Sequence, residues 1–232
     1  MSLAGESDLS SEEKPVSQVR RAVALLREMI TTNKLLPGSN HLESELAKML
    51  RMSRTPVHEA AILLESQGLV EVVPRRGVRI LPLSADDMEE IYAILTELES
   101  LAAYTLARDG LSPDQLRTLR SHIQEMEAAL AKEDRQAWAR ADDLFHRDLV
   151  AMGRNRRLTA IVSTYWDQVQ RARLLTLFMR PLPHASNADH RALVDAIAEG
   201  DAEQARAIHR EHRLKAKRMM VELIARHGLT AV

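Results

Sequence analysis

Residues 43–70 constrain the fold of this 232-residue chain more than any other segment. Apolar residues at helical spacing from 42 to 50 predict a short helix, and residues 52–55 form a turn after it. Pro56 fits the first turn of a second helix, where its missing N–H costs nothing, and that helix extends to Gln67. Two short helices joined by a tight turn predict a helix–turn–helix, whose second helix is narrow enough to enter the DNA major groove.

The flanking segments complete a small domain. Residues 16–33 have the apolar spacing of a further helix. Two β-rich runs, 69–73 and 78–81, flank a Pro-Arg-Arg-Gly tip and predict a hairpin. Two short strands are not stable alone, so we expect them to pack on the three helices as a wing. We therefore predict a winged helix–turn–helix, with three helices plus a two-stranded wing, over residues 16–82, preceded by a disordered tail at residues 1–15.

The chain after residue 82 is predicted to be helical throughout. Ser84 suits the N-cap of its first helix. Short connections between amphipathic helices favour antiparallel neighbours, so residues 83–228 should form an all-α antiparallel helical bundle, and the fold class is mainly α. The six predicted helical segments are residues 85–108, 113–132, 135–152, 156–179, 186–199 and 202–227.

The net charge of −1 conceals an uneven distribution. Residues 14–82 carry 11 Lys and Arg against 6 Asp and Glu, a net charge of +5. Residues 83–232 carry 21 basic against 23 acidic side chains, and residues 1–13 carry four acids and no Lys or Arg. The basic excess therefore coincides with the domain predicted to meet phosphates.

Other classes of protein are disfavoured by composition. The chain has no cysteine, which excludes disulfides and thiol chemistry and suits a reducing compartment. No apolar run approaches the roughly 20 residues that span a bilayer, and the acidic N-terminal segment lacks the features of a secretion signal. We expect a cytoplasmic protein with no membrane contact.

Six polar side chains lie where a winged helix touches DNA. Arginine is the commonest reader of guanine, and helix N-termini attract phosphate oxygens. The alternative is that these are solvated loop residues on a structural domain. The candidates are Ser53, Arg54, Thr55 and His58 near the start of the second helix of the pair, and Arg75 and Arg76 at the wing tip.

A set of possible metal ligands lies in the bundle. Asp142 and His146 are four residues apart on one predicted helix and therefore share a face. With His190 and His212 they offer one carboxylate and three imidazoles, which suit a divalent ion such as Zn²⁺, Ni²⁺ or Mn²⁺. Read from the residues alone, an Asp–His pair at this spacing is more often a surface ion pair than a metal site.

The N-terminal domain resembles the GntR-type bacterial transcription regulators. That resemblance implies a homodimer that binds a palindromic operator on double-stranded DNA. The chain departs from the family at His58 and Ser44, where relatives carry arginine, so Ser44 joins the DNA-contact candidates. The resemblance is carried by Leu46-Ala47, Ser53 to Ala60, Leu64, Gly68 to Val70 and Arg76 to Val78.

The bundle resembles the FCD-type ligand domain of the FadR subfamily through residues 142–146, 190–201 and 205–212. The resemblance implies that Asp142, His146, His190 and His212 hold a divalent metal ion and that a small carboxylate effector completes its coordination. His209 is expected to be solvated, and Asp143 to face away.

One departure concerns the effector. Leu95 occupies a position where many relatives carry arginine, which weakens the case for a dicarboxylate or sugar acid bound in the usual manner. Arg171 and Arg173 are candidate replacements, with solvated or interface positions as the alternative.

These features together predict a ligand-responsive transcription regulator, a repressor rather than an enzyme. Two alternatives use the same Asp and His residues. One is a metal-dependent hydrolase, although no helix with two histidines and a glutamate general base accompanies the ligands. The other is a metal that is purely structural or is itself the signal.

Overall fold

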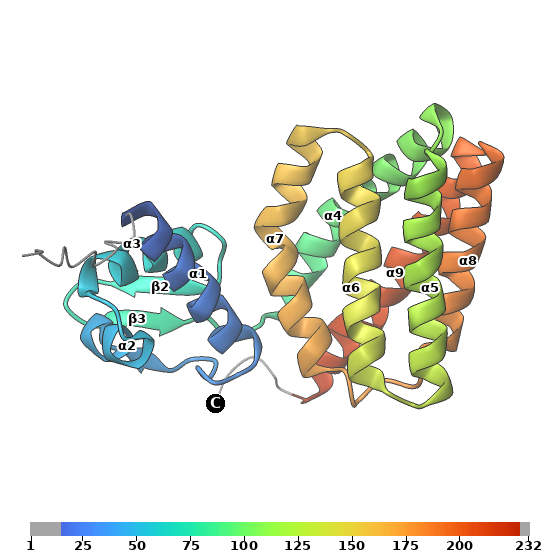
Figure 1. The fold of residues 1–232 in the computed structure, drawn as a ribbon. Coiled ribbons are helices and arrows are strands. Elements are labelled where there is room, and N and C mark those ends of the chain that lie inside the picture. Colours follow the sequence, from blue (N-terminus) through green and yellow to red (C-terminus); the bar gives the residue numbers. More distant parts are fainter. Residues whose placement is uncertain (1–14, 228–232) are drawn as a thin grey trace, which may run out of the picture.

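The computed structural model describes residues 15–227, with nine helices and three short strands in that range. The tail predicted at residues 1–15 lies outside the described residues except for Pro15, which begins the first helix. Residues 15–80 form an N-terminal head and residues 85–227 a helical bundle (Figure 1). The head helices are α1 (Pro15–Thr31), α2 (Glu43–Leu50) and α3 (Arg54–Glu65).

The wing contains one strand more than predicted. β2 (Val70–Val73) and β3 (Gly77–Ile80) form the expected hairpin, and β1 (Asn40–His41) pairs antiparallel with the other edge of β3. Two residues are too few to show the alternation that identifies a strand in a sequence. Gly77 permits the close approach, because a Cβ there would lie 2.3 Å from the carbonyl oxygen of His41. The prediction of a two-stranded wing was therefore incomplete.

The six predicted bundle helices are all present. Ser84 caps the first of them as expected, since its hydroxyl accepts a hydrogen bond from the Asp87 N–H. The clearest difference is the end of the fourth, predicted at residue 179 and observed at Leu175. Their bounds are α4 (Ala85–Asp109), α5 (Pro113–Ala131), α6 (Arg135–Met152), α7 (Arg156–Leu175), α8 (His184–Glu199) and α9 (Ala202–His227).

The early end of α7 is stabilised by a side chain further along the chain. Arg180 donates from Nη2 to the carbonyl oxygen of Arg173 at 2.7 Å and from Nε to that of Thr176 at 3.4 Å. The last carbonyls of a helix have no partner within it, and a basic side chain satisfies them. Helix-forming residues 176–179 therefore leave the helix because Arg180 folds back onto its end.

Three apolar clusters stabilise the molecule. One fills the head between its helices and the sheet, around Leu26, Leu46 and Ile80. The other two lie in the bundle, one around Phe145 and Leu193 and the other where α4 packs against α7 and α9. The α4 and α9 helices run along each other through the bundle, and α7 is the bundle helix nearest the head (Figure 1).

Side chains from about one turn of α7 join the bundle to the head. They contact α1, the turn that follows α3, and the segment that leads from β3 to the bundle. The contacts are Arg27 Nε to Asp167 Oδ2 at 2.5 Å, Gln168 Nε2 to the Gln67 carbonyl at 2.7 Å, and Arg171 Nη1 to the Leu81 carbonyl at 2.6 Å. The two domains therefore share an interface built on one helix.

None of the helices within residues 15–227 combines the length and the apolar character that a bilayer crossing requires.

Candidate metal centre and DNA-contact surface

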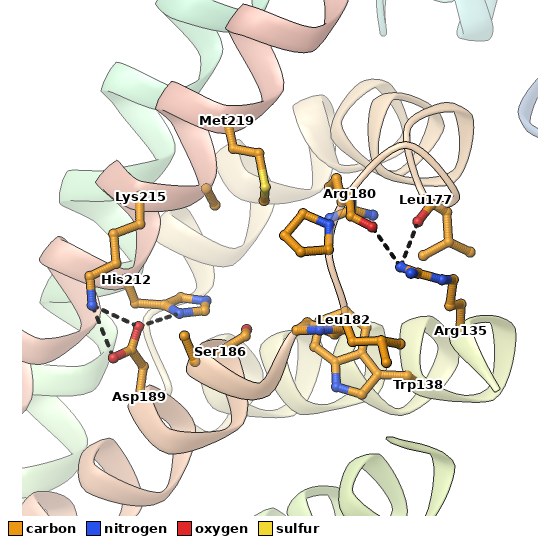
Figure 2. A pocket seen from close by; sticks show the side chains of 14 residues that line it. Arg135, Trp138, Leu177, Arg180, Leu182, Ser186, Asp189, His212, Lys215 and Met219 are labelled. Atoms are coloured by element: carbon orange, nitrogen blue, oxygen red, sulfur yellow. Dashed lines mark hydrogen bonds and ion pairs between the residues drawn. The ribbon is translucent and has the colours of Figure 1, made fainter. Parts of the chain in front are cut away.

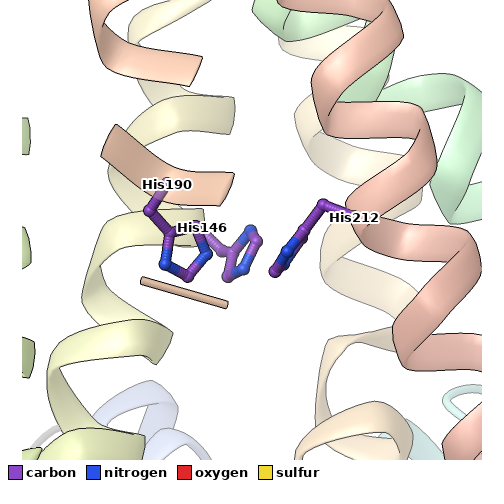
Figure 3. Close-up of side chains that lie close together, drawn as sticks. All are labelled: His146, His190 and His212. Carbon is purple, nitrogen blue, oxygen red and sulfur yellow. The ribbon is translucent and has the colours of Figure 1, made fainter. Parts of the chain in front are cut away.

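Three histidines from three helices converge inside the bundle. His146 comes from α6, His190 from α8 and His212 from α9, and their rings face one another (Figure 3). One ring nitrogen of each lies within 4.8 Å of the other two. Asp142 lies one turn before His146, with its Oδ1 3.5 Å from His190 Nε2 and 3.7 Å from His146 Nε2. The four predicted ligands are thus brought together.

The hydrogen bonding of these side chains fits a metal ion. Asp142, His146 and His190 are at most 1% exposed, yet both ring nitrogens of His190, Nε2 of His146 and Oδ1 of Asp142 have no hydrogen-bond partner. Buried polar atoms without partners are costly, and a cation among them would remove that cost. One carboxylate with three imidazoles is a donor set that divalent transition metals accept.

His190 and His212 are also in the protonation state that a metal needs. Burial lowers the pKa of His190 well below its usual value and that of His212 to about 3, and neighbouring cationic groups add to the effect. Both rings are therefore neutral at physiological pH, and a neutral imidazole has a lone pair to give to a metal.

Glu99 on α4 extends the cluster. It is fully buried, with Oε2 3.5 Å from His146 Nδ1 and 3.3 Å from His209 Nε2, and Oε1 3.0 Å from Arg213 Nη2. Burial would raise the pKa of Glu99, but Arg213 and the hydrogen bonds from His146 and His209 outweigh it and hold the pKa well below its usual value. The ionised Glu99 carboxylate is therefore placed to orient His146, as partners of metal-binding histidines do.

His209 was wrongly expected to be solvated. Its side chain is fully buried, and burial lowers its pKa to about 4. With Glu99 and His146 it makes a second group whose ligand atoms lie within 4.8 Å of one another. Both groups have three members and share His146. Asp142 lies beside the group of three histidines, whereas Glu99 in the other group is paired with Arg213. Asp143 faces α7, where it accepts a hydrogen bond from Trp166 Nε1.

The candidate DNA-contact residues are all on the surface of the head. Ser53 precedes α3, so Arg54 is the first helical residue and extends into solvent with 72% of its side chain exposed. His58 Nδ1 lies 2.7 Å from Glu43 Oε1, and Arg54 Nη2 lies 3.8 Å from Glu43 Oε2. Glu43 therefore orients both side chains. All seven candidates, Ser44, Ser53, Arg54, Thr55, His58, Arg75 and Arg76, are exposed.

Residues 18–80 match the bacterial regulatory proteins of the gntR family, and residues 90–215 match the FCD domain. The chain belongs to the GntR family of transcription regulators and carries an FCD domain. An uncharacterized HTH-type transcriptional regulator in the TAR-I ttuE-ttuC' intergenic region of Agrobacterium vitis is 41% identical over 151 residues, which cover 64% of this chain and 85% of the relative.

Two further comparisons extend over most of the GntR-family chain. A probable D-xylose utilization operon transcriptional repressor of Paenarthrobacter nicotinovorans is 30% identical over 82% of this chain and 81% of its own length. The solved structure of E. coli McbR/YncC has the same fold, with a TM-score of 0.75 at 22% identity over 89% of this chain and 98% of that chain.

The two arginines considered for effector binding in the FCD domain have different surroundings. Arg173 Nη2 contacts Asp142 Oδ2 and therefore lies beside the group formed by Asp142, His146, His190 and His212. Burial lowers its pKa to about 10, so it remains charged at neutral pH. Arg171 is 2% exposed and donates to the Leu81 carbonyl at the junction with the head. Arg171 is buried, whereas the Arg173 side chain is 11% exposed, and Arg173 alone of the two reaches the predicted ligands.

Glu99, His209 and Arg213 were not assigned to the site from the sequence, although the helical spacing contains a signal for each. Glu99 continues the apolar stripe of Ile91 and Leu95 at intervals of four residues, and a carboxylate in such a stripe needs a buried partner. His209 and His212 are three apart, and His209 and Arg213 four apart, so they share a face of α9. Leu95 itself is fully buried in the apolar core.

Proposed function

We propose that this GntR-family regulator is a repressor that binds a palindromic operator as a homodimer. A small carboxylate bound at a divalent metal ion in the FCD domain controls it. Asp142, His146, His190 and His212 would hold the metal, which acts as a Lewis acid that attracts an anionic oxygen. The observation that carries the proposal is the convergence of three buried histidine rings beside Asp142, with both ring nitrogens of His190 lacking a hydrogen-bond partner. The similarity to a probable repressor from Paenarthrobacter nicotinovorans supports repression rather than activation of transcription.

The charges around the cluster favour an anionic effector. Asp142 and Glu99 contribute two negative charges, and their partners Arg173 and Arg213 contribute two positive charges. The histidines with lowered pKa values add none at neutral pH. A divalent ion therefore introduces two positive charges into a buried site that is otherwise balanced, and an incoming carboxylate offsets part of that excess.

Helix α7 supplies a route from the effector to the head. Arg173 and Arg171 are two residues apart, so they project about 200° apart around the helix. One contacts Asp142 at the cluster, and the other holds the Leu81 carbonyl where the chain leaves the head. A ligand that displaces Arg173 from Asp142 would rotate or shift α7 and change how the head is held. Two heads then lose the spacing that matches successive half-sites.

The homodimer is supported by an exposed apolar face on α4. Ile94 is 43% exposed and Leu101 is 41% exposed, and residues seven apart lie on one face of a helix. A second copy packed there would place two heads on one duplex. Because the chromosome is the target, we expect the protein to work in the cytoplasm.

The test of DNA recognition is the Arg54→Ala variant. Removal of a charged donor that reaches base edges or phosphates should weaken operator binding about tenfold or more. Fluorescence anisotropy with a labelled operator at physiological salt measures the change. Arg117→Ala, which removes an exposed arginine on α5, is the matched control and should bind normally. Equal affinities for the two variants would remove α3 as the recognition helix.

The test of the metal centre is the double variant His190→Ala/His212→Ala. It should lose the bound metal, measured by elemental analysis, and keep operator binding, because both side chains lie in the FCD domain. His184→Ala removes an exposed histidine from the same helix as His190 and should keep full occupancy. Full occupancy in the double variant would refute the proposed ligands.

A further inference from the structure

A cavity of about 230 Å³ opens beside His212 at one end of the bundle (Figure 2). It lies between α6, α8, α9 and the connection from α7 to α8, and the His212 ring extends from α9 toward its middle. A dry cavity of about 150 Å³ lined by aliphatic and aromatic side chains holds benzene, so this one has room for a body of roughly six to ten carbon atoms. His212 thus belongs to both the metal cluster and the wall of a small cavity.

The walls of the cavity are mostly apolar. Trp138 and Leu182 form one side, and Leu177 and Met219 face them (Figure 2). The indole N–H of Trp138 is not free, since it donates to Asn187 Oδ1 at 2.8 Å. A ligand with several hydroxyl groups would therefore bury donors and acceptors without partners, which costs free energy for each.

The three cations that border the cavity are already engaged. Arg135 Nη1 donates to the Arg180 carbonyl at 2.7 Å, and Arg180 itself donates to two backbone carbonyls at the end of α7. Lys215 Nζ lies 3.1 Å from both oxygens of Asp189. The Asp189 carboxylate also lines the cavity, so it would repel a second anionic group on the ligand. The end of the cavity at His212, next to the proposed metal ligands and Arg173, is therefore the part best suited to bind an anionic group.

We infer that the effector is a monocarboxylate with a compact hydrocarbon body. Its carboxylate lies at the metal end, and its body fills the cavity between Trp138, Leu182 and Met219. This inference rests on the proposed function, because it takes the metal cluster as the carboxylate site. It adds the chemical class of the ligand and excludes dicarboxylates and sugar acids.

Three six-carbon acids and acetate test the ligand class on the full-length chain loaded with Zn²⁺. Hexanoate has one carboxylate and an apolar body, adipate adds a second carboxylate, gluconate adds hydroxyl groups, and acetate supplies the carboxylate alone. Isothermal titration and thermal shift measure binding. Hexanoate should bind tightest, and from acetate upward each added CH₂ should strengthen binding about fourfold until the cavity is full, as expected from about 0.8 kcal/mol for each buried CH₂.

The outcomes separate the two proposals. If adipate or gluconate binds tighter than hexanoate, or if hexanoate binds no tighter than acetate, the inference is overturned and the carboxylate-controlled regulator stands. If none of the four acids binds, acetate included, the carboxylate effector of the proposed function fails as well.

Variants of the wall locate the body of the ligand. Ala216→Leu adds bulk to the cavity and should abolish the gain of hexanoate over acetate while metal content stays unchanged. Ala188→Leu makes the same change at an exposed position of α8 outside the cavity and should bind hexanoate normally. Met219→Ala enlarges the cavity and should shift the preferred acid toward octanoate, which keeps the test open if Ala216→Leu does not fold. Unchanged chain-length preference in Met219→Ala and Ala216→Leu would overturn the assignment.

Discussion

Glu99 illustrates how much a single residue outside the ligand set contributes to this site. Its carboxylate lies between Arg213 and two histidines in a fully buried position, so it offsets a buried cation and orients a proposed ligand at once. Removing one partner of a buried ion pair leaves an uncompensated charge, which is far more costly than losing a pair at the surface.

Glu99→Gln should therefore reduce both stability and metal affinity. We expect a loss of about 3 kcal/mol in the free energy of unfolding, measured with urea, because Arg213 loses its counter-charge. Metal affinity should fall by about 10- to 100-fold, measured by titration with a chelating dye, because His146 is no longer oriented. Glu97→Gln changes a half-exposed glutamate on the same helix and should cost less than about 0.5 kcal/mol. Similar losses in the two variants would contradict the role given to Glu99.

At the residue scale, the sequence predicted side chains that follow a pattern and missed those whose role depends on packing. Asp142 and His146 share a face by spacing, and the family resemblance is what joined His190 and His212 to them as one set of ligands. The contacts of Arg173 with Asp142 and of Glu99 with Arg213 join helices far apart in the chain. Helical periodicity reports the face of one helix, not the neighbour that the face meets, so neither contact was predictable.

Among the elements, α7 has the clearest double role, because it borders the proposed metal ligands and carries the contacts to the head. Gly68, at the start of the wing, is part of that junction. Its φ of 68° is in the left-handed region, and a Cβ there would lie 2.6 Å from the Gln168 amide nitrogen. Gly200 has a similar left-handed φ of 78°, but a Cβ there would lie 3.8 Å from the Ala107 carbonyl oxygen, an ordinary van der Waals contact.

These two glycines separate backbone strain from loss of the junction. Gly200→Ala should lower the free energy of unfolding by about 1 kcal/mol, the cost of a left-handed φ for a residue with a Cβ. Gly68→Ala should lose more, because Gln168 must also move and its hydrogen bond to the Gln67 carbonyl weakens. It should reduce the effect of a bound effector on operator affinity, measured by anisotropy with and without ligand. Equal stability losses and equal effector responses would show that Gln168 plays no part in coupling.

The elements themselves were largely predictable from periodicity and caps. The starts of α4, α5, α6, α7 and α9 lie where a capping residue or a break precedes an apolar stripe. The strand β1 and the end of α7 were not predictable, for a common reason. Both are determined by distant residues, β1 by the edge of β3 and the end of α7 by the Arg180 guanidinium.

For the whole molecule, the buried histidines make the stability of the metal-free protein depend on pH. The pKa of His209 is lowered to about 4 and that of His212 to about 3, and that of His190 is also well below 6.5, mainly because of burial. The unfolded chain takes up a proton on each near pH 6.5, whereas the folded chain does so only at lower pH. Stability is therefore complete above pH 6.5 and falls as the pH decreases below it, by about 1.4 kcal/mol per pH unit for each histidine.

Urea unfolding in the presence of a chelator at pH 7.5, 6.5 and 5.5 measures this dependence. His209→Gln should remove about one third of the slope, because a glutamine does not titrate. His227→Gln changes an exposed histidine at the end of α9 and should leave the slope as it is. A free energy of unfolding that stays constant from pH 6.5 to 5.5 would mean that these rings take up protons in the folded protein at the same pH as in the unfolded chain.

The two-residue strand β1 has a consequence for how the protein searches a genome. It ties the segment between α1 and α2 to the central strand of the wing, so the helix pair and the hairpin move as one body. Major-groove and wing contacts are then made or broken together at each trial position. A base sequence that fits the recognition helix but not the wing is therefore released as a whole, because neither contact can be kept without the other.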